Sequence, residues 1–147
     1  MLKSWVCMLL LTVASSTLPA QGGLRPDDVK AADVRAVRAV VEGQLKALAA
    51  GDATKAFSYA SPAIRQQFGD PGTFMDMVRS NYPMLIRPAS VSFFRPEARD
   101  GAVAQGVHFR DREGKLWRAV YELARQPDKR WRINGCAVAP EDDASTT

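Results

Sequence analysis

Cysteine and histidine are scarce in this chain of 147 residues, which holds two cysteines and one histidine. Cys7 falls in an N-terminal segment that we expect to be removed, so Cys136 remains alone and no internal disulfide is expected. One histidine and one cysteine are too few for a usual zinc site, and the acidic residues show no calcium-loop spacing. We therefore expect no bound metal, and we expect Cys136 to be buried in the last strand as a small apolar side chain.

Motifs for nucleophilic catalysis and for phosphate binding are also absent. The sequence has no Gly-x-Ser-x-Gly elbow and no glycine-rich phosphate loop, and no cofactor is expected. His108 falls on the polar face of a predicted strand, which favours a solvated histidine over a catalytic one. The formal net charge is only +4, and the basic residues are interspersed with acidic ones. This pattern is typical of a solvated surface, so we expect no nucleic-acid partner.

Long hydrophobic runs are missing except at the N-terminus. Lys3 precedes an apolar run over 5–13, and Leu18-Pro19-Ala20 forms a small-residue exit, which predicts a secretory signal peptide cleaved after Ala20. A membrane span needs roughly 20 mainly apolar residues, and hydroxyl residues interrupt this run well before that. We expect a periplasmic or secreted protein with no stable membrane insertion after cleavage. Residues 21–32 are predicted to be a flexible leader, 33–140 a single domain, and 141–147 a disordered acidic tail.

The first half of the predicted domain has helical spacing. Apolar residues recur every three or four positions from Val34 to Leu48, which predicts an amphipathic helix with Asp33 as its N-cap and Gly51 just beyond its end. Three further N-cap signals each predict a short helical segment. Asp52 precedes a helix over 53–60, Ser61-Pro62 opens a segment that stops at Gly69, and Asp70-Pro71 opens a helix over 72–81. The last of these helices is expected to bury Phe74, Met77 and Val78.

From Ser90 the apolar period becomes two, which predicts four antiparallel strands over 90–93, 103–110, 117–123 and 131–134. A three-residue loop over 112–114 pairs Phe109 with Trp117 and keeps the apolar residues on one face. A similar loop over 127–129 places Tyr121 opposite Gly135. The predicted fold class is α+β, with N-terminal helices packed on one face of a curved four-stranded meander. Between the helices and the sheet we expect a cone that can hold a ligand.

Several strings in the sequence resemble one bacterial family. They include 60–64 with 68–70, then Phe74, Val78 and Tyr82-Pro83, and finally 121–123 with Trp131-Arg132-Ile133-Asn134-Gly135-Cys136. This pattern, over about 33–140, resembles the family catalogued as domain of unknown function 4864, which is similar to the nuclear-transport-factor-2-like, or cystatin-like, α+β superfamily. The resemblance implies a fold and an exported bacterial setting, and it transfers no catalytic residue. Lys129 is a departure, because relatives tend to have glycine at that turn position.

The candidate ligand-cavity residues follow from the strand register. Tyr121, Gln105 and Gly135 are expected on its floor, Tyr59 and Tyr82 reach it from the helical half, and Asp76 is the acid to consider there. The alternative is that Tyr121 simply packs in the core and makes one hydrogen bond.

Two hypotheses remain open for the function. In the first, the module is non-enzymatic and binds a small apolar or amphipathic ligand, or a partner protein, through the cone or the sheet face; a homodimer through the sheet belongs to this hypothesis. In the second, it is an acid–base enzyme like the ketosteroid isomerases and polyketide cyclases of the superfamily. The second hypothesis needs an ionisable group inside the cone. The strand register places Tyr121 there but no Asp, Glu or His, so binding is favoured.

Overall fold

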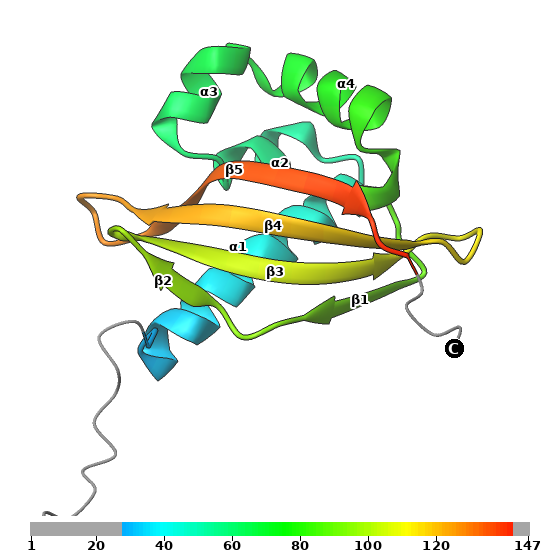
Figure 1. Cartoon of the computed structure of the whole chain (residues 1–147). Coiled ribbons are helices and arrows are strands. Elements are labelled where there is room, and N and C mark those ends of the chain that lie inside the picture. The colour runs from blue at the N-terminus through cyan, green and yellow to red at the C-terminus, as the bar shows by residue number, and fades with distance from the viewer. Residues whose placement is uncertain (1–27, 143–147) are drawn as a thin grey trace, which may run out of the picture.

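A computed structural model describes residues 28–142, and the predicted signal peptide and its cleavage site lie outside this range. Four α-helices and a short 3₁₀ helix precede an antiparallel sheet, which confirms the predicted α+β class. Figure 1 shows α1 running across one face of the sheet, with α3 and α4 stacked beyond the β5 edge. Within the described residues, no helix is both long and apolar enough to cross a membrane.

The first helix, α1 (Ala31–Ala49), begins three residues earlier than predicted, with Lys30 at the N-cap position. The predicted cap, Asp33, lies in the first turn instead, where its Oδ1 accepts a hydrogen bond of 3.3 Å from Trp131 Nε1. This carboxylate therefore joins α1 to the last strand and does not cap the helix. Gly51 follows the helix with a φ of +69°, a left-handed conformation that glycine adopts without strain.

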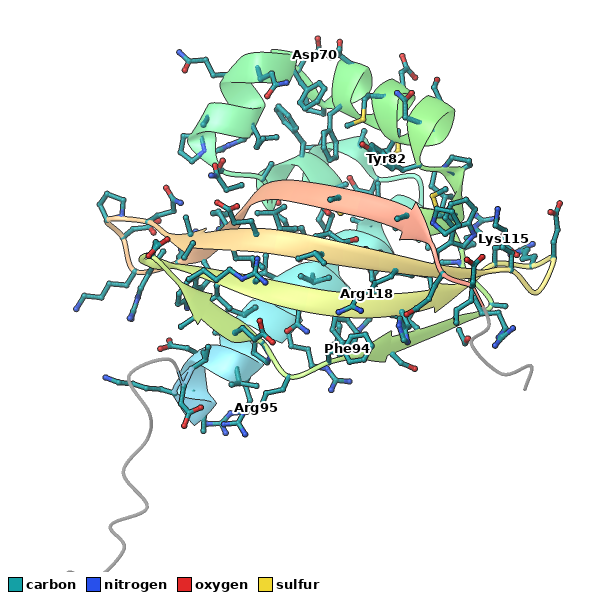
Figure 2. All side chains as sticks on the ribbon, in the orientation of Figure 1. Asp70, Tyr82, Phe94, Arg95, Lys115 and Arg118 are labelled. Carbon is teal, nitrogen blue, oxygen red and sulfur yellow. The ribbon has the colours of Figure 1, made fainter. Side chains whose placement is uncertain are left out.

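The three short helices begin at the predicted caps. They are α2 (Ala53–Ser58), α3 (Pro62–Phe68) and α4 (Pro71–Asn81), and a 3₁₀ turn, η1 (Pro83–Leu85), follows them. The side chains of Asp52, Ser61 and Asp70 each accept a hydrogen bond from the backbone N–H three residues later, at 3.0, 3.3 and 2.9 Å. Figure 2 shows Asp70 where α3 gives way to α4. These caps set the helix boundaries that enclose the candidate site.

The sheet contains five strands where four were predicted. They are β1 (Ser90–Phe93), β2 (Glu97–Arg99), β3 (Ala102–Arg110), β4 (Leu116–Arg125) and β5 (Trp131–Pro140). Their order is β1-β3-β4-β5, and β2 pairs with the other end of β3. Strand β2 escaped prediction because it is short, lacks apolar alternation and follows Pro96, which has no backbone N–H.

The β3–β4 register is the predicted one, with Phe109 opposite Trp117 and Gln105 opposite Tyr121. The β4–β5 register was predicted correctly at Leu123 and Ile133, but the pairing of Tyr121 with Gly135 was wrong. Asn134 is an extra residue in β5, a bulge, so Tyr121 lies opposite Cys136. The reason is a tertiary contact: Asn134 Oδ1 accepts a hydrogen bond of 2.9 Å from Ser61 Oγ.

The edge of β5 also receives the link between α2 and α3. Ile133 N donates to Tyr59 O and Ser61 N donates to Ile133 O, both at 2.8 Å, which forms a short parallel bridge. This bridge anchors the start of α3 beside the sheet.

The core lies between α1 and the inner face of the sheet, where Val107, Phe109, Ala119 and Leu123 are fully buried. The opposite face is not covered by the helices (Figure 1). Phe94 and Arg118 lie on this outer face (Figure 2), with the Arg118 guanidinium 5.3 Å from the centre of the Phe94 ring.

Candidate functional site

A cavity of about 240 Å³ lies where α1, α3 and α4 meet the inner face of β4 and β5. Fifteen residues line it, and most are apolar: Gln44, Leu48, Ala60, Ile64, Gln67, Phe68, Phe74, Met77, Val78, Tyr82, Leu85, Tyr121, Ile133, Gly135 and Cys136. Small-molecule sites typically occupy roughly 300–1,000 Å³, so this cavity suits a compact ligand. An apolar cavity of about 150 Å³ is already large enough to bind benzene.

Tyr121 lies on the floor of this cavity. The residue is 1% exposed, and its hydroxyl oxygen has no nitrogen or oxygen partner among the described residues. The neighbouring Cys136 thiol is the group that shares a hydrogen bond with it. A buried hydroxyl left unpaired costs free energy, and most buried tyrosines in folded proteins find a partner. Burial raises the pKa of Tyr121 well above its ordinary value, so the phenol is neutral and retains a proton to donate.

The Cys136 thiol lies beside the Tyr121 phenol because the bulge brings these two residues opposite each other. Burial raises the pKa of the thiol to about 12. The residue as a whole is half-buried, not fully buried as predicted. The Tyr121 phenol and the Cys136 thiol on the floor of the cavity are therefore both protonated and neutral at neutral pH.

Gln44 is a buried wall residue that sequence reasoning missed. Its Nε2 donates a hydrogen bond of 3.2 Å to Ala56 O, which ties α1 to α2. The signal was present in the sequence, because Gln44 is a polar residue on the apolar face of α1 between Val41 and Leu48. A buried amide at such a position indicates a specific hydrogen bond or a cavity wall.

The structure brings only some of the predicted cavity residues together. Tyr121, Gly135 and Tyr82 line the cavity, and Figure 2 shows Tyr82 between α4 and the sheet. Gln105 faces the same side of the sheet but is not among the lining residues. Its Nε2 donates to Phe94 O at 2.7 Å and to Gly106 O at 2.9 Å, which bridges the gap between β1 and β2.

Tyr59 and Asp76 also lie apart from the lining. The Tyr59 ring packs on Gly43, where a Cβ atom would lie 2.4 Å from the phenol oxygen. The Asp76 side chain is 79% exposed and forms a 3.9 Å ion pair with Arg79. The helical half therefore contributes no carboxylate to the cavity.

His108 lies on the outer face of the sheet, opposite Arg118 in the register. Its ring packs edge-to-face on Phe94 at 4.3 Å, and its Nε2 contacts the Glu141 carboxylate. Across residues 28–142 no group of three or more His, Cys, Asp or Glu side chains is arranged to hold a metal ion.

Comparisons with known proteins give a family and a fold. The model of the family described as "Domain of unknown function (DUF4864)" matches residues 30–146. No curated protein matches the sequence. Among solved structures, the chain is similar to an NTF-2 like protein of unknown function from Silicibacter pomeroyi DSS-3. The TM-score is 0.53 at 15% sequence identity, and the alignment covers 77% of this chain and 100% of that chain.

At that identity the structural likeness concerns the fold alone, and it agrees with the helix-then-sheet architecture described above. The family match is broader, because it spans nearly every described residue and includes the bulged strand β5. The chain therefore belongs to the DUF4864 family, whose function is unknown, and it has an NTF-2-like α+β fold.

Proposed function

We propose that this protein is an exported, non-enzymatic module that binds a compact, mainly apolar ligand in the cavity between α3, α4 and the sheet. One observation carries the proposal: the cavity is lined mainly by apolar side chains, and none of the described lining residues is charged. A ligand that fills this volume gains free energy from the burial of apolar surface.

The chemistry of the lining favours binding over acid–base catalysis. A general acid or base works best with a pKa near the operating pH. None of the lining residues among 28–142 is Asp, Glu, His, Lys or Arg. The two buried titratable groups on the floor, Tyr121 and Cys136, have raised pKa values and stay protonated at neutral pH. The ketosteroid-isomerase type of mechanism has no carboxylate here to use.

Helix α3 forms a weakly packed wall of the cavity. Helix α3 has no fully buried residue, and its Ile64 and Phe68 are half-buried while lining the cavity. Small displacements of such a weakly packed helix open a path to the interior, since elements with few buried contacts are the first to open.

Titration with toluene, followed by NMR of the folded domain, tests the proposal without presupposing a polar group on the ligand. Toluene is expected to shift resonances of lining residues and to saturate. Ile64→Trp, which adds an indole ring at the rim, is expected to abolish binding, whereas the matched change Tyr59→Phe away from the lining leaves it intact. Absence of saturable shifts in the wild-type domain would contradict the proposal.

A further inference from the structure

A second hollow, of about 440 Å³, lies between the start of α3 and the β4–β5 turn, and its lining is basic. We infer that this basic hollow binds a doubly charged phosphate group, either free phosphate or the head of a small phosphomonoester, through the guanidinium groups of its three arginines. Eight residues line the hollow: Ser58, Pro62, Arg65, Gln126, Pro127, Asp128, Arg130 and Arg132.

The three arginines come from parts of the chain that are distant in the sequence. Arg65 lies on α3, whereas Arg130 and Arg132 lie at the start of β5. The short parallel bridge between Ala60 and Ile133 holds the beginning of α3 beside this end of β5. Figure 1 shows α3 above the end of the sheet where the β4–β5 turn lies. The fold therefore gathers basic side chains that the sequence intersperses with acidic ones.

The charge of the basic hollow is only partly balanced. Its lining holds three arginines and one acid, Asp128. Asp128 Oδ2 lies 3.7 Å from Arg130 Nε, and both side chains are exposed, so this ion pair is weak. Among residues 28–142 the Arg65 side chain has no hydrogen bond or ion pair, and that of Arg132 donates only from Nη1, to Trp131 O at 2.8 Å. The lining thus keeps an excess of positive charge and several guanidinium donors without an acceptor.

The donors of the basic hollow suit a phosphate better than a single carboxylate. A guanidinium group is planar and donates pairs of N–H bonds to phosphate or carboxylate oxygens. A phosphate head carries roughly 1.5 to 2 negative charges at neutral pH and three strong acceptor oxygens, whereas a carboxylate carries one charge and two oxygens. Small-molecule sites typically occupy roughly 300–1,000 Å³, so the hollow also has room for the organic part of a small phosphomonoester.

Helix α3 separates the basic hollow from the apolar cavity. Pro62 and Arg65 line the hollow, while Ile64 and Phe68 line the cavity, and the two linings share no residue. Phosphate binding therefore does not depend on the proposed function, and either can fail without the other.

The test is NMR titration of the folded protein with glycerol 3-phosphate, inorganic phosphate and glycerate, at about pH 8 and constant ionic strength. The two phosphates are expected to shift resonances of residues that line the basic hollow and to saturate. Glycerate, which carries one carboxylate, is expected to bind at least fivefold more weakly. Tighter binding of glycerol 3-phosphate than of inorganic phosphate identifies a phosphomonoester as the ligand, and binding of inorganic phosphate that is at least as tight identifies the free ion.

Three variants separate a local site from a general effect of net charge. Arg65→Gln is expected to weaken glycerol 3-phosphate binding about fivefold, because it removes a charge-assisted donor that has no other partner. Asp128→Asn is expected to tighten binding, since it removes the opposing charge and keeps an acceptor for the Arg130 N–H. Arg79→Gln is the matched control: it removes the same charge from an exposed arginine on α4, outside the hollow, and leaves binding unchanged.

The inference is overturned if neither phosphate gives saturable shifts in the basic hollow, or if glycerate binds as tightly as glycerol 3-phosphate. Equal weakening by Arg65→Gln and Arg79→Gln also overturns it, because binding would then follow the net charge of the protein and not this site.

Discussion

Cys136 carries the only thiol within residues 28–142, and its chemistry is set by its position against Tyr121. A thiolate is the reactive form of cysteine, and burial disfavours any charged form. The pKa of about 12 means that almost none of the thiol is ionised at neutral pH. The residue is thus suited to line an apolar site and not to act as a nucleophile.

The shifted pKa predicts how the stability of the protein changes in alkali. The unfolded thiol ionises near 9.0 and the folded thiol near 12, so the unfolded state loses its proton first as pH rises. The contribution of the protonated Cys136 thiol to the free energy of unfolding is complete below about pH 9, and it is lost progressively between about pH 9 and about pH 12. We expect the wild-type free energy of unfolding to fall relative to that of Cys136→Ala over this window, as measured by urea denaturation. Parallel pH profiles of the two proteins would contradict the burial of the thiol.

Thiol labelling in the native state is a direct check of the same environment. At about pH 8 we expect the native mature protein to react slowly with a thiol reagent, and we expect one equivalent per mature chain to react in denaturant.

The turn between β3 and β4 shows how one side chain organises an element. Asp111 accepts hydrogen bonds from Trp117 Nε1 at 2.9 Å, from Lys115 N at 2.9 Å and from Glu113 N at 3.0 Å. These bonds, with the Trp117 bond the largest contributor, hold the pKa of the Asp111 carboxyl below its ordinary value. Gly114 completes the turn with a φ of +86°.

Asp111→Ala is expected to lower the melting temperature at neutral pH, because three donors lose their acceptor. The folded-state pKa of Asp111 is depressed, so its contribution is present above the unfolded value of about 3.8 and is lost as pH falls through the lower folded value. The difference in melting temperature between wild type and variant should therefore shrink in acid below about pH 4. Thermal unfolding followed by circular dichroism measures this difference in melting temperature. A difference that persists in acid would rule out an electrostatic role for the Asp111 carboxylate.

Element boundaries were largely predictable from local chemistry. Capping depends on a side chain and a backbone N–H three residues apart, so Asp52, Ser61 and Asp70 were readable without the tertiary structure. Asp33 was misread as a cap because its actual partner, Trp131, is distant in the sequence. Strand β2 was missed because its three residues, which pair with β3, are too few to show an alternation of apolar and polar side chains.

At the scale of the whole molecule, the expected export makes one further prediction. Residues 1–20 have the basic start, apolar run and small-residue exit of a signal peptide. Protein recovered from a bacterial periplasmic fraction should have the intact mass of a chain that begins at Gln21. A mass that retains Met1 to Ala20 would contradict cleavage. The predicted homodimer through the sheet likewise stays a prediction.

The class, the order of the elements other than β2, and the β3–β4 register were determined by the sequence alone. Hydrophobic period, cap residues and turn residues act over a few positions, and a one-residue slip would expose the apolar face. The composition of the cavity was decided only by the tertiary structure. Asn134 bulges out of β5 to meet Ser61, 73 residues away, and this moves Cys136 opposite Tyr121. Since neither the bulge nor the packing of α3 and α4 over it has a local signature, the position of the Tyr121 hydroxyl beside the Cys136 thiol could be found only once the chain had folded.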